Sequence, residues 1–484
     1  MQKAFDLGGQ IKLGHFLFDE NEKAELYRLK YLPQEKMAGG LADQVQMQLW
    51  GNHAWKRIQF SWKINGSAQK GDSSLESKEK NKIEEAGITW QPIPELRWYA
   101  GKKVLSWGKG HGWTPLAFLD PHRDPLDPDM PHTGLIFLGT EYEREFPPSP
   151  DPLQALTFTS LIFPVQEKVN EGFGHLNNWN MAGKLSLLFW NTELDWVVLK
   201  GKSRPEHYGF DFSRKVNSFL EIYGDFWTSP LYEKVFLDQS GELWKTEYTA
   251  FGSLQGLRYE RWGMCCTVEY YRNKAGFNPE EMSTYYNYLQ TVVDAYPKEG
   301  GTEARKRIMI LSNAYYQHPN PMQEYAYTQI LKRAPLGVQH LTCSIAGVWN
   351  IQDRSYALCP EIRYNSKPNL NIGLKNTFWQ GNPHTEFGEQ IKHWSVEISL
   401  TYSFESSFSA TPSYSAEPYQ YQKEPHLEES QPEPPPHEEP YLDESQPETP
   451  PYEEPYLDES EPETPPYEES LPEEPDQGST GTLR

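Results

Sequence analysis

The chain has 484 residues and a formal net charge of −23 at pH 7, and 14% of its residues are aromatic. The charge is uneven, because residues 405–484 carry −20 whereas the part up to Phe404 carries only −3. Without a clustered basic excess, the chain lacks the electrostatic footprint of a nucleic-acid-binding protein.

The N-terminus, "MQKAFDLGGQIKLG", has neither the basic n-region nor the apolar h-region of a secretory signal peptide. If the protein is exported, we therefore expect the chain to be a mature form with an added Met, or to carry a misplaced start. No run approaches the ~18 consecutive apolar residues of a membrane-spanning helix.

Segments of alternating apolar and polar residues recur along the chain and predict half-buried strands. We count 16 to 20 such segments before Phe404, and no convincing amphipathic helix. In 27–31, Tyr27, Leu29 and Tyr31 oppose Arg28 and Lys30; in 57–64, Ile58, Phe60, Trp62 and Ile64 oppose Arg57, Gln59, Ser61 and Lys63. Residues 181–189 alternate less strictly, and residues 369–378 form a later alternating segment. Arg97 is expected on the polar face of a further strand.

The stretch from Trp107 to His132 is rich in proline and glycine, and it holds a cluster of acidic and histidine side chains. The members are Asp120, His122, Asp124, Asp127, Asp129 and His132. Such groups can bind a cation, but Asp-Pro and Pro-His pairs are also ordinary turn formers and no EF-hand spacing is present. We predict no metal site.

The four cysteines suggest neither haem attachment nor a redox motif, since there is no C-x-x-C. Cys343 shares a face with Leu341 and Ile345, whereas Cys359 shares one with Glu361 and Arg363. Opposed residues of a hairpin share a face, so we expect unpaired thiols. No cofactor is predicted.

The last alternating segment is "HWSVEISLTYSF", with Trp394, Tyr402 and Phe404 among its apolar residues. Residues 405–484 then hold 17 of the 40 prolines and repeat with a period of 15, as "EEPYLDESQPETPPY" and "EEPYLDESEPETPPY". Proline removes donors and like charges repel, so we predict an extended, disordered, acidic tail. It is interpreted either as a solvated spacer or as a docking tail for a basic partner.

Two architectures use strands with one apolar and one polar face. A soluble sandwich or propeller buries one face against a second sheet, whereas a transmembrane barrel turns it to lipid and its polar face to a watery lumen. The polar faces here carry Arg, Lys, Glu and Asn, which are costly in a packed sandwich. We therefore predict an all-β fold, a transmembrane antiparallel β-barrel of about 18 strands (range 16–20) over residues 1–404.

The closing Leu-x-Tyr-x-Phe of residues 400–404 resembles the C-terminal assembly signal of bacterial outer-membrane β-barrels, although a tail follows it here. "LRWYAGKKVLSWGKGHGWTPLAFLDPHRDPLDPD" (96–129), "EYYRNKAGF" (269–277) and "GNPHTEFGEQ" (381–390) resemble strand-to-loop segments of porin-like outer-membrane families. The resemblance implies a bacterial outer-membrane location, periplasmic termini, contact with outer-membrane lipid and insertion by the barrel assembly machinery.

We expect residues 105–132 to fold inward as a pore constriction, the alternative being an outer loop away from the pore. Asp120, His122, Asp124, Asp127 and Asp129 would then face a basic ladder of Arg28, Lys30, Arg57, Lys63 and Arg97. Opposed charges would set a transverse field that orients solutes.

The predicted function is a porin-like channel for passive or weakly selective passage of small hydrophilic solutes or ions. The alternative is a barrel that sheaths or anchors a partner, such as a cytochrome, a polysaccharide or a cell-wall component, with the tail as a periplasmic docking arm. No nucleophile motif of the G-x-S-x-G type stands near His15, His111, His175 or His207, so we do not predict an enzyme.

Overall fold

The computed structural model describes residues 3–31, 40–71, 74–120, 124–127, 133–147, 152–295 and 301–409. Residues 410–484, most of the predicted tail, lie outside the described residues. The strands are β1 (Lys3–Glu20), β2 (Gly40–Trp55), β3 (Ile58–Gly71), β4 (Ser74–Ile93), β5 (Leu96–Lys103), β6 (Leu135–Glu145), β7 (Leu153–Val165), β8 (Asn178–Phe189), β9 (Thr192–Gly201), β10 (His207–Asn217), β11 (Leu220–Leu237), β12 (Leu243–Arg261), β13 (Met264–Asn273), β14 (Glu324–Arg333), β15 (Leu341–Asn350), β16 (Tyr356–Lys367), β17 (Leu370–Gln380) and β18 (Lys392–Ser409). The helices are α1 (Glu25–Tyr31), α2 (Pro279–Ala295) and α3 (Gly301–Leu311), with short helical turns at Glu171–Phe173, Ser312–Tyr316 and Pro335–Gly337.

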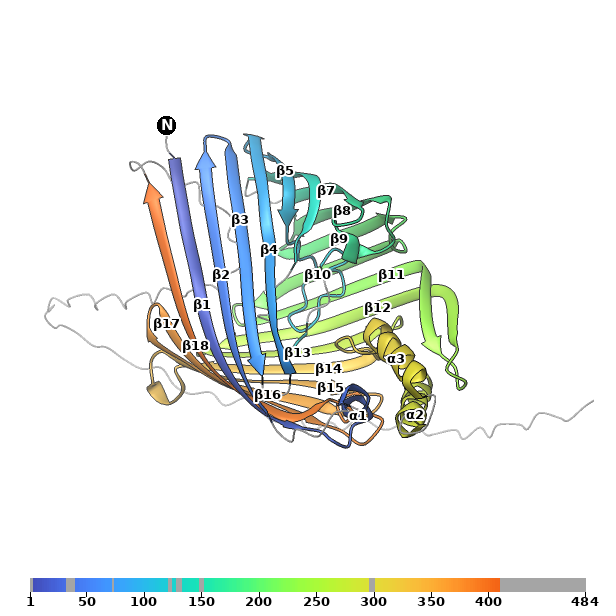
Figure 1. The fold of residues 1–484 in the computed structure, drawn as a ribbon. Helices are drawn as coiled ribbons and strands as arrows, with labels where there is room; N and C mark the ends of the chain where they lie inside the picture. The colour runs from blue at the N-terminus through green and yellow to red at the C-terminus, as the bar shows by residue number, and fades with distance from the viewer. Residues whose placement is uncertain are drawn as a thin grey trace, which may run out of the picture. The chain divides into compact units, whose positions relative to one another are not determined.

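The 18 strands form one closed antiparallel barrel, as predicted (Figure 1). Each strand pairs with its neighbour in sequence, and β1 closes the sheet by pairing with both β2 and β18. Closure lets the backbone N–H and C=O groups of every strand pair with a neighbour, whereas an open sheet would leave those of its two edge strands unpaired.

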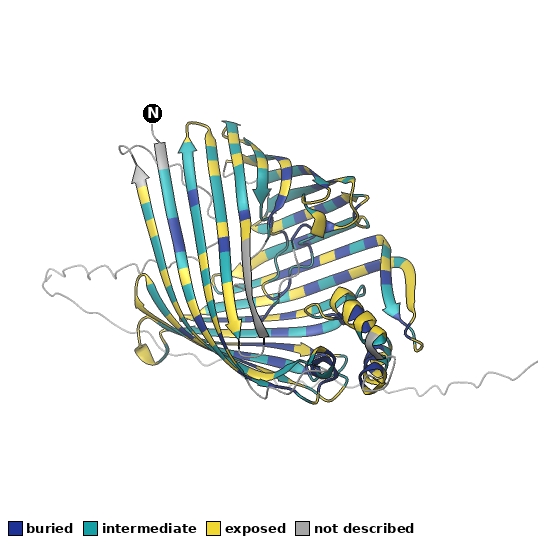
Figure 2. Ribbon diagram, viewed as in Figure 1, coloured by how far each residue is buried: buried dark blue, intermediate teal, exposed yellow. Residues whose placement is uncertain are grey.

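Burial alternates along the strands with a period of two residues (Figure 2). On β3, Ile58, Phe60 and Ile64 are 40%, 43% and 42% exposed, while the polar residues between them point to the other face. In a closed barrel the exposed apolar face is the outer one and the polar face lines the interior. The strand predictions at 57–64, 181–189 and 369–378 are confirmed.

The two ends of the barrel differ in loop length. At the end where β1 begins and β18 ends, several turns have two residues, as between β8 and β9 (Trp190 and Asn191) and between β12 and β13 (Trp262 and Gly263). All four of these residues have positive φ, as the tight turns that suit strand twist require. At the opposite end, the connections 104–134 and 274–323 are much longer.

Two sequence predictions about helices are wrong. Residues 27–31 form helix α1 rather than a strand, so Arg28 and Lys30 are not on a strand face. The helices α2 and α3 were not anticipated either. Alternation over only five residues was too short to distinguish a strand from a helix here. The apolar side chains of α1 pack against helices that come much later in the chain, and this packing favours the helix. Among the described residues, no helix combines the length and apolar character needed to cross a membrane.

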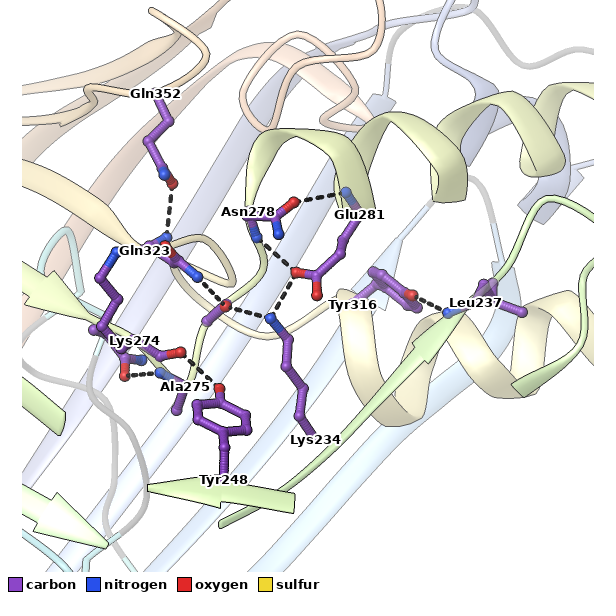
Figure 3. Close-up of polar contacts among 12 residues, drawn as sticks. Lys234, Leu237, Tyr248, Lys274, Ala275, Asn278, Glu281, Tyr316, Gln323 and Gln352 are labelled. Carbon is purple, nitrogen blue, oxygen red and sulfur yellow. Dashed lines mark hydrogen bonds and ion pairs between the residues drawn. The ribbon is translucent and has the colours of Figure 1, made fainter. Parts of the chain in front are cut away.

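Helix α2 carries a start signal that sequence inspection could have used. Asn278 accepts a hydrogen bond from the N–H of Glu281 (2.9 Å), and the Glu281 carboxylate accepts one from the N–H of Asn278 (2.8 Å) (Figure 3). This is a capping box, and Pro279 takes the first helical position. Lys234 of β11 adds an ion pair to Glu281 (2.6 Å), which ties the helix start to the barrel rim.

Strand β18 extends five residues beyond Phe404, to Ser409. The expected boundary between barrel and tail at residue 404 is therefore too early. Residues 405–409 pair with Ala4–Gly8 of β1, so they belong to the closed sheet. The predicted apolar face of β18 is confirmed, since Trp394, Ile398 and Tyr402 are 36%, 48% and 48% exposed.

The buried apolar side chains form two clusters, both on one side of the barrel interior. One joins the three helices to β11, β12 and β14–β16, and the other joins residues 105–119 to β6–β9, β11 and β12. Within the described residues, neither cluster takes a side chain from β1–β4 or β18. The inner faces of those five strands are left uncovered by these clusters.

Candidate functional site

The connection after β5 crosses the interior of the barrel. Its buried side chains Leu105, Trp107, Leu116 and Phe118 pack on β6–β12, and Leu126 reaches β17, where its carbonyl accepts a hydrogen bond from Lys375 (2.8 Å). A segment that leaves β5 and contacts the inner sides of both β9 and β17 must run through the interior. Figure 1 shows it between the front and rear walls.

Lys109 of this segment is held by carboxylates of the wall. Its Nζ lies 2.8 Å from Glu193, 3.2 Å from Asp195 and 3.8 Å from Asp211. Burial alone would lower the pKa of Lys109, but these carboxylates raise it above its ordinary value. Lys109 is therefore charged across the whole physiological range.

Asp195, Asp211 and Asp225 form a row across β9, β10 and β11, since they stand directly opposite one another in the strand register. They are only 1%, 0% and 0% exposed. Like charges directly opposite each other on neighbouring strands repel, so the row needs compensating donors. Lys109 supplies both its ammonium and its backbone N–H, which donates to Asp225 (3.0 Å).

Glu269 of β13 anchors the next three residues of the segment. Its carboxylate accepts hydrogen bonds from the N–H groups of His111 (2.6 Å), Gly112 (2.9 Å) and Trp113 (3.4 Å). The hydroxyl of Tyr223 donates to it as well (2.7 Å). A Cβ on Gly112 would come within 2.9 Å of the Glu269 carboxylate, so glycine permits this close approach of the backbone.

His111 is the exposed residue of this anchor, and its ring meets Tyr223 edge-on at 5.2 Å. The ring touches solvent but is enclosed by the barrel wall. That enclosure, together with the positive charge of Arg258, lowers the pKa of His111 to about 4. His111 is therefore neutral at physiological pH.

The predicted acidic residues of the segment are dispersed. Asp120 is buried beside Ser106, whose hydroxyl lies 3.5 Å away, and Asp124 accepts from the N–H of Leu126 (2.9 Å) in a local turn. Burial raises the pKa of Asp124. Asp127 is exposed and lies 3.7 Å from Lys375 of β17. His122 and Asp129 lie outside the described residues.

The predicted basic ladder is not assembled as one row. Lys63 pairs with Glu84 (2.9 Å), and Arg97 pairs with Glu141 and Glu143 (2.6 Å each).

Arg57 lies in the two-residue turn between β2 and β3, and its guanidinium bonds the carbonyl of Pro92. Arg28 lies in α1 and pairs with Asp294 (2.7 Å), and Lys30 lies in the same helix. Three of the five residues are thus off the strand faces, because turns and helices end the alternation there.

The sign of the contact also differs in part from the expectation. At Lys109 and His111 the crossing segment presents an ammonium and backbone N–H groups to carboxylates of the wall, whereas at Asp127 a carboxylate approaches the wall cation Lys375. The wall residues missed by sequence reasoning share a signal, a single acidic residue flanked by apolar ones in a strand: "ELDWV", "FDF", "GDF" and "VEY". A lone carboxylate within such a run predicts a buried partner.

The cysteine prediction agrees with the strand register. Cys343 stands opposite Ile362 and Cys359 opposite Ala346, so the two side chains take opposite faces of the β15–β16 hairpin. All four cysteines are free. Among the described residues, no group of three or more His, Cys, Asp or Glu side chains is arranged to hold a metal ion.

No protein-family model matches the sequence, and no curated protein matches it. Among solved structures, the chain is similar to OccK9 (OpdG) of Pseudomonas aeruginosa, at 9% identity and a TM-score of 0.48, over 84% of this chain and 98% of that one. It is also similar to OccAB3 of Acinetobacter baumannii (10%, TM-score 0.47, 83% and 99%) and to the outer membrane protein opdK of P. aeruginosa (8%, 0.45, 83% and 99%). The expected all-β barrel fold is confirmed by the closed 18-stranded antiparallel sheet itself.

Proposed function

We propose that the protein is an outer-membrane channel that lets small hydrophilic solutes or ions pass passively or with weak selectivity. The observation that carries the proposal is the one-sided filling of the barrel. The crossing segment and both apolar clusters cover the inner side of β6–β16, whereas the polar inner faces of β18 and β1–β4 take no part in either cluster. This division supports a polar path along the uncovered strands.

The outer surface supports a membrane location. Apolar side chains that are 37–59% exposed recur on the outer faces of neighbouring strands, among them Ile11, Val45, Ile88 and Leu138. Lipid is the solvent that suits such a belt. The short turns at the end where β1 begins and β18 ends, and the long loops at the other end, are typical of outer-membrane barrels with periplasmic termini.

In this proposal residues 105–132 narrow the path. The segment is tied at Lys109 to β9, at His111 to β13 and at Leu126 to β17. His111 and Asp127 are exposed polar residues of the segment that contact the wall. Lys63 and Arg97 are the basic residues of the predicted ladder that do lie on strands before the segment. The ionised groups at this constriction set the selectivity of the channel among ions.

Conductance of the purified, folded protein in planar lipid bilayers tests the function. We expect stepwise insertion of pores with stable ohmic conductance. A folded barrel that inserts without conducting would contradict the channel, and would favour the alternative of a barrel that sheaths or anchors a partner, with residues 410–484 as its docking arm.

A further inference from the structure

The inner face of four adjacent strands, β18, β1, β2 and β3, includes three rows of aligned residues that are all polar except Gly14. In the strand register the rows are Ser403–Gln10–Gln48–Asn65, Thr401–Lys12–Gln46–Ser67 and Ser399–Gly14–Gln44–Gln69. All twelve positions alternate with the exposed apolar residues of the outer face. We call these three rows the amide strip.

The amide strip carries almost no net charge. Of its twelve positions only Lys12 is ionisable, and its ammonium forms an ion pair of 2.7 Å with Glu397 on the same wall. The row below, toward the termini, holds Glu405 and Lys63, and Lys63 pairs with Glu84 at 2.9 Å. Asp6 lies one row further. The charges of this wall are thus paired or placed at the terminal end.

Within the described residues, the crossing segment shares no apolar cluster with the strands of the strip. None of the strip's residues belongs to either apolar cluster; Gln44, Gln46 and Gln48 remain partly exposed, whereas Asn65 at the end of its row is buried. On the covered side, by contrast, Asp195, Asp211, Asp225 and Glu269 are used to hold Lys109 and the N–H groups of the segment. These four carboxyl groups are therefore engaged on the covered side, away from the strip.

An aromatic surface continues the strip. Trp50 lies between Gln48 and Asn52 on the inner face of β2. Its indole lies so close over Gly8 of β1 that a Cβ on Gly8 would come within 2.4 Å of the ring. The indole therefore lies over Gly8, one row from the strip, and offers an apolar aromatic face beside the amides. Such a face packs against the C–H groups of a sugar or polyol.

We propose that the amide strip selects neutral polyhydroxylated solutes, such as sugars and sugar alcohols, over organic ions of the same size; this inference rests on the channel function proposed above. A carboxamide offers both donors and acceptors, so a row of them can exchange hydrogen bonds with successive hydroxyl groups. Because the strip offers no net charge, an ion that enters gains little attraction to replace its lost hydration.

Three solutes of similar length separate charge from size: sorbitol, gluconate and N-methylglucamine. Uptake of each, radiolabelled, is measured into proteoliposomes that contain the full chain. We expect sorbitol to enter at least about threefold faster than either ion, in keeping with a charge penalty of ~0.7 kcal/mol or more. Equal entry, or faster entry of either ion, would overturn the inference while leaving the channel function intact.

Single charges introduced into the middle row give a second readout. Gln46→Glu should slow gluconate and speed N-methylglucamine, and Gln46→Lys should do the reverse, each by at least about threefold. Gln290→Glu, on an exposed position of α2, is the matched control and should change none of the rates. If both Gln46 variants fold and leave all three rates unchanged, the strip does not line the path. If no solute enters and the folded protein does not conduct, the channel function fails as well.

Discussion

The ammonium of Lys109 lies 3.2 Å from the carboxylate of Asp195, so a side chain of the segment after β5 is anchored to β9 on the inner wall. Asp195 is 1% exposed and also contacts Lys184 at 3.2 Å. The ion pair joins two parts of the barrel that are far apart in sequence, and it holds the segment in the interior. The first prediction concerns this contact.

Lys109→Met should detach the segment, because it leaves the row of buried aspartates without its main cation. Removing one partner of a buried ion pair costs about 3 kcal/mol or more. We expect a lower temperature for the heat-induced shift in electrophoretic mobility and larger, noisier single-channel currents. Lys306→Met, on an exposed position of α3, is the control. Unchanged currents and mobility in Lys109→Met would show that the ion pair does not hold the segment.

Glu269→Gln tests the second anchor. The carboxylate accepts four hydrogen bonds, from three N–H groups and from Tyr223. A carboxamide can accept at one oxygen only, so some donors lose their partner, at about 2–3 kcal/mol. We expect faster proteolysis within 104–120 and increased current noise, compared with the exposed Glu280→Gln. Protease resistance equal to that of the wild type would contradict the anchor.

The pH dependence of stability tests Glu386, in the loop between β17 and β18. Burial raises the pKa of Glu386 to about 8, the negative charge of Asp353 adds to this, and the carboxyl is hydrogen-bonded to Tyr325 (2.7 Å) and Asn350 (2.8 Å). The ordinary pKa of a glutamate is 4.5.

Between pH 4.5 and 8 the folded state therefore binds a proton that the unfolded state has released. The contribution of Glu386 to stability is present below pH 4.5 and falls as the pH rises toward 8, by roughly 1.4 kcal/mol per pH unit. Glu386→Gln, which resembles the protonated form, should remove this part of the pH dependence. The measurement is the thermal unfolding midpoint of both proteins at pH 5 and pH 8; parallel changes would refute the assignment.

Asp127→Asn tests the constriction. Among the described members of the predicted acidic set, Asp127 is the exposed one, and it lies 3.7 Å from Lys375. Removing its charge leaves Lys375 with less compensating negative charge, so the reversal potential in a salt gradient should shift toward anion preference. Glu303→Gln on the exposed face of α3 should leave it unaltered. The same measurement on the combined Asp120, Asp124 and Asp127→Asn variant should give little further change, because Asp120 is buried.

Two truncations locate the functional end of the barrel. Deleting residues 410–484 should leave heat-modifiable mobility unchanged, because the strand pairs of β18 end at Ser409. Deleting 405–484 removes the pairs with Ala4–Gly8 and should lower the unfolding temperature or slow assembly. Equal behaviour of the two truncated proteins would mean that these five residues contribute nothing to closure.

The barrel could be predicted because its information is local and repeated. Alternation such as that of Ile58, Phe60 and Ile64 reports which face meets an apolar solvent, and it does not depend on the identity of the strand's neighbours. The same reasoning failed at Tyr27, where five alternating residues belong to a helix. It also missed α2, although the capping box of Asn278 and Glu281 is visible in the sequence.

The candidate site was predicted only as a region. The described part of the proline- and glycine-rich stretch after β5 lies in the interior, where Asp127 approaches Lys375, but the contact of Lys109 with buried carboxylates was not anticipated. Lys109, rather than Asp120, makes the ion pair with the opposite wall. Which strand faces the segment depends on barrel closure and on the direction of the loop, and no periodicity in the sequence records either.

The order of residues alone predicted strands with one apolar and one polar face, and their approximate number. It also predicted that Cys343 and Cys359 are unpaired, and that the composition changes to a proline-rich, acidic one near the end of the chain. The tertiary structure alone decided that the aspartates of β9, β10 and β11 meet in one row beneath Lys109, and that the glutamines of β1 and β2 align on the opposite, uncovered wall. The physical reason is that the preference of a side chain for water or for an apolar solvent depends on that side chain alone, so it can be read from the sequence. An ion pair or a hydrogen bond needs a partner, and distant partners come together only when the sheet closes.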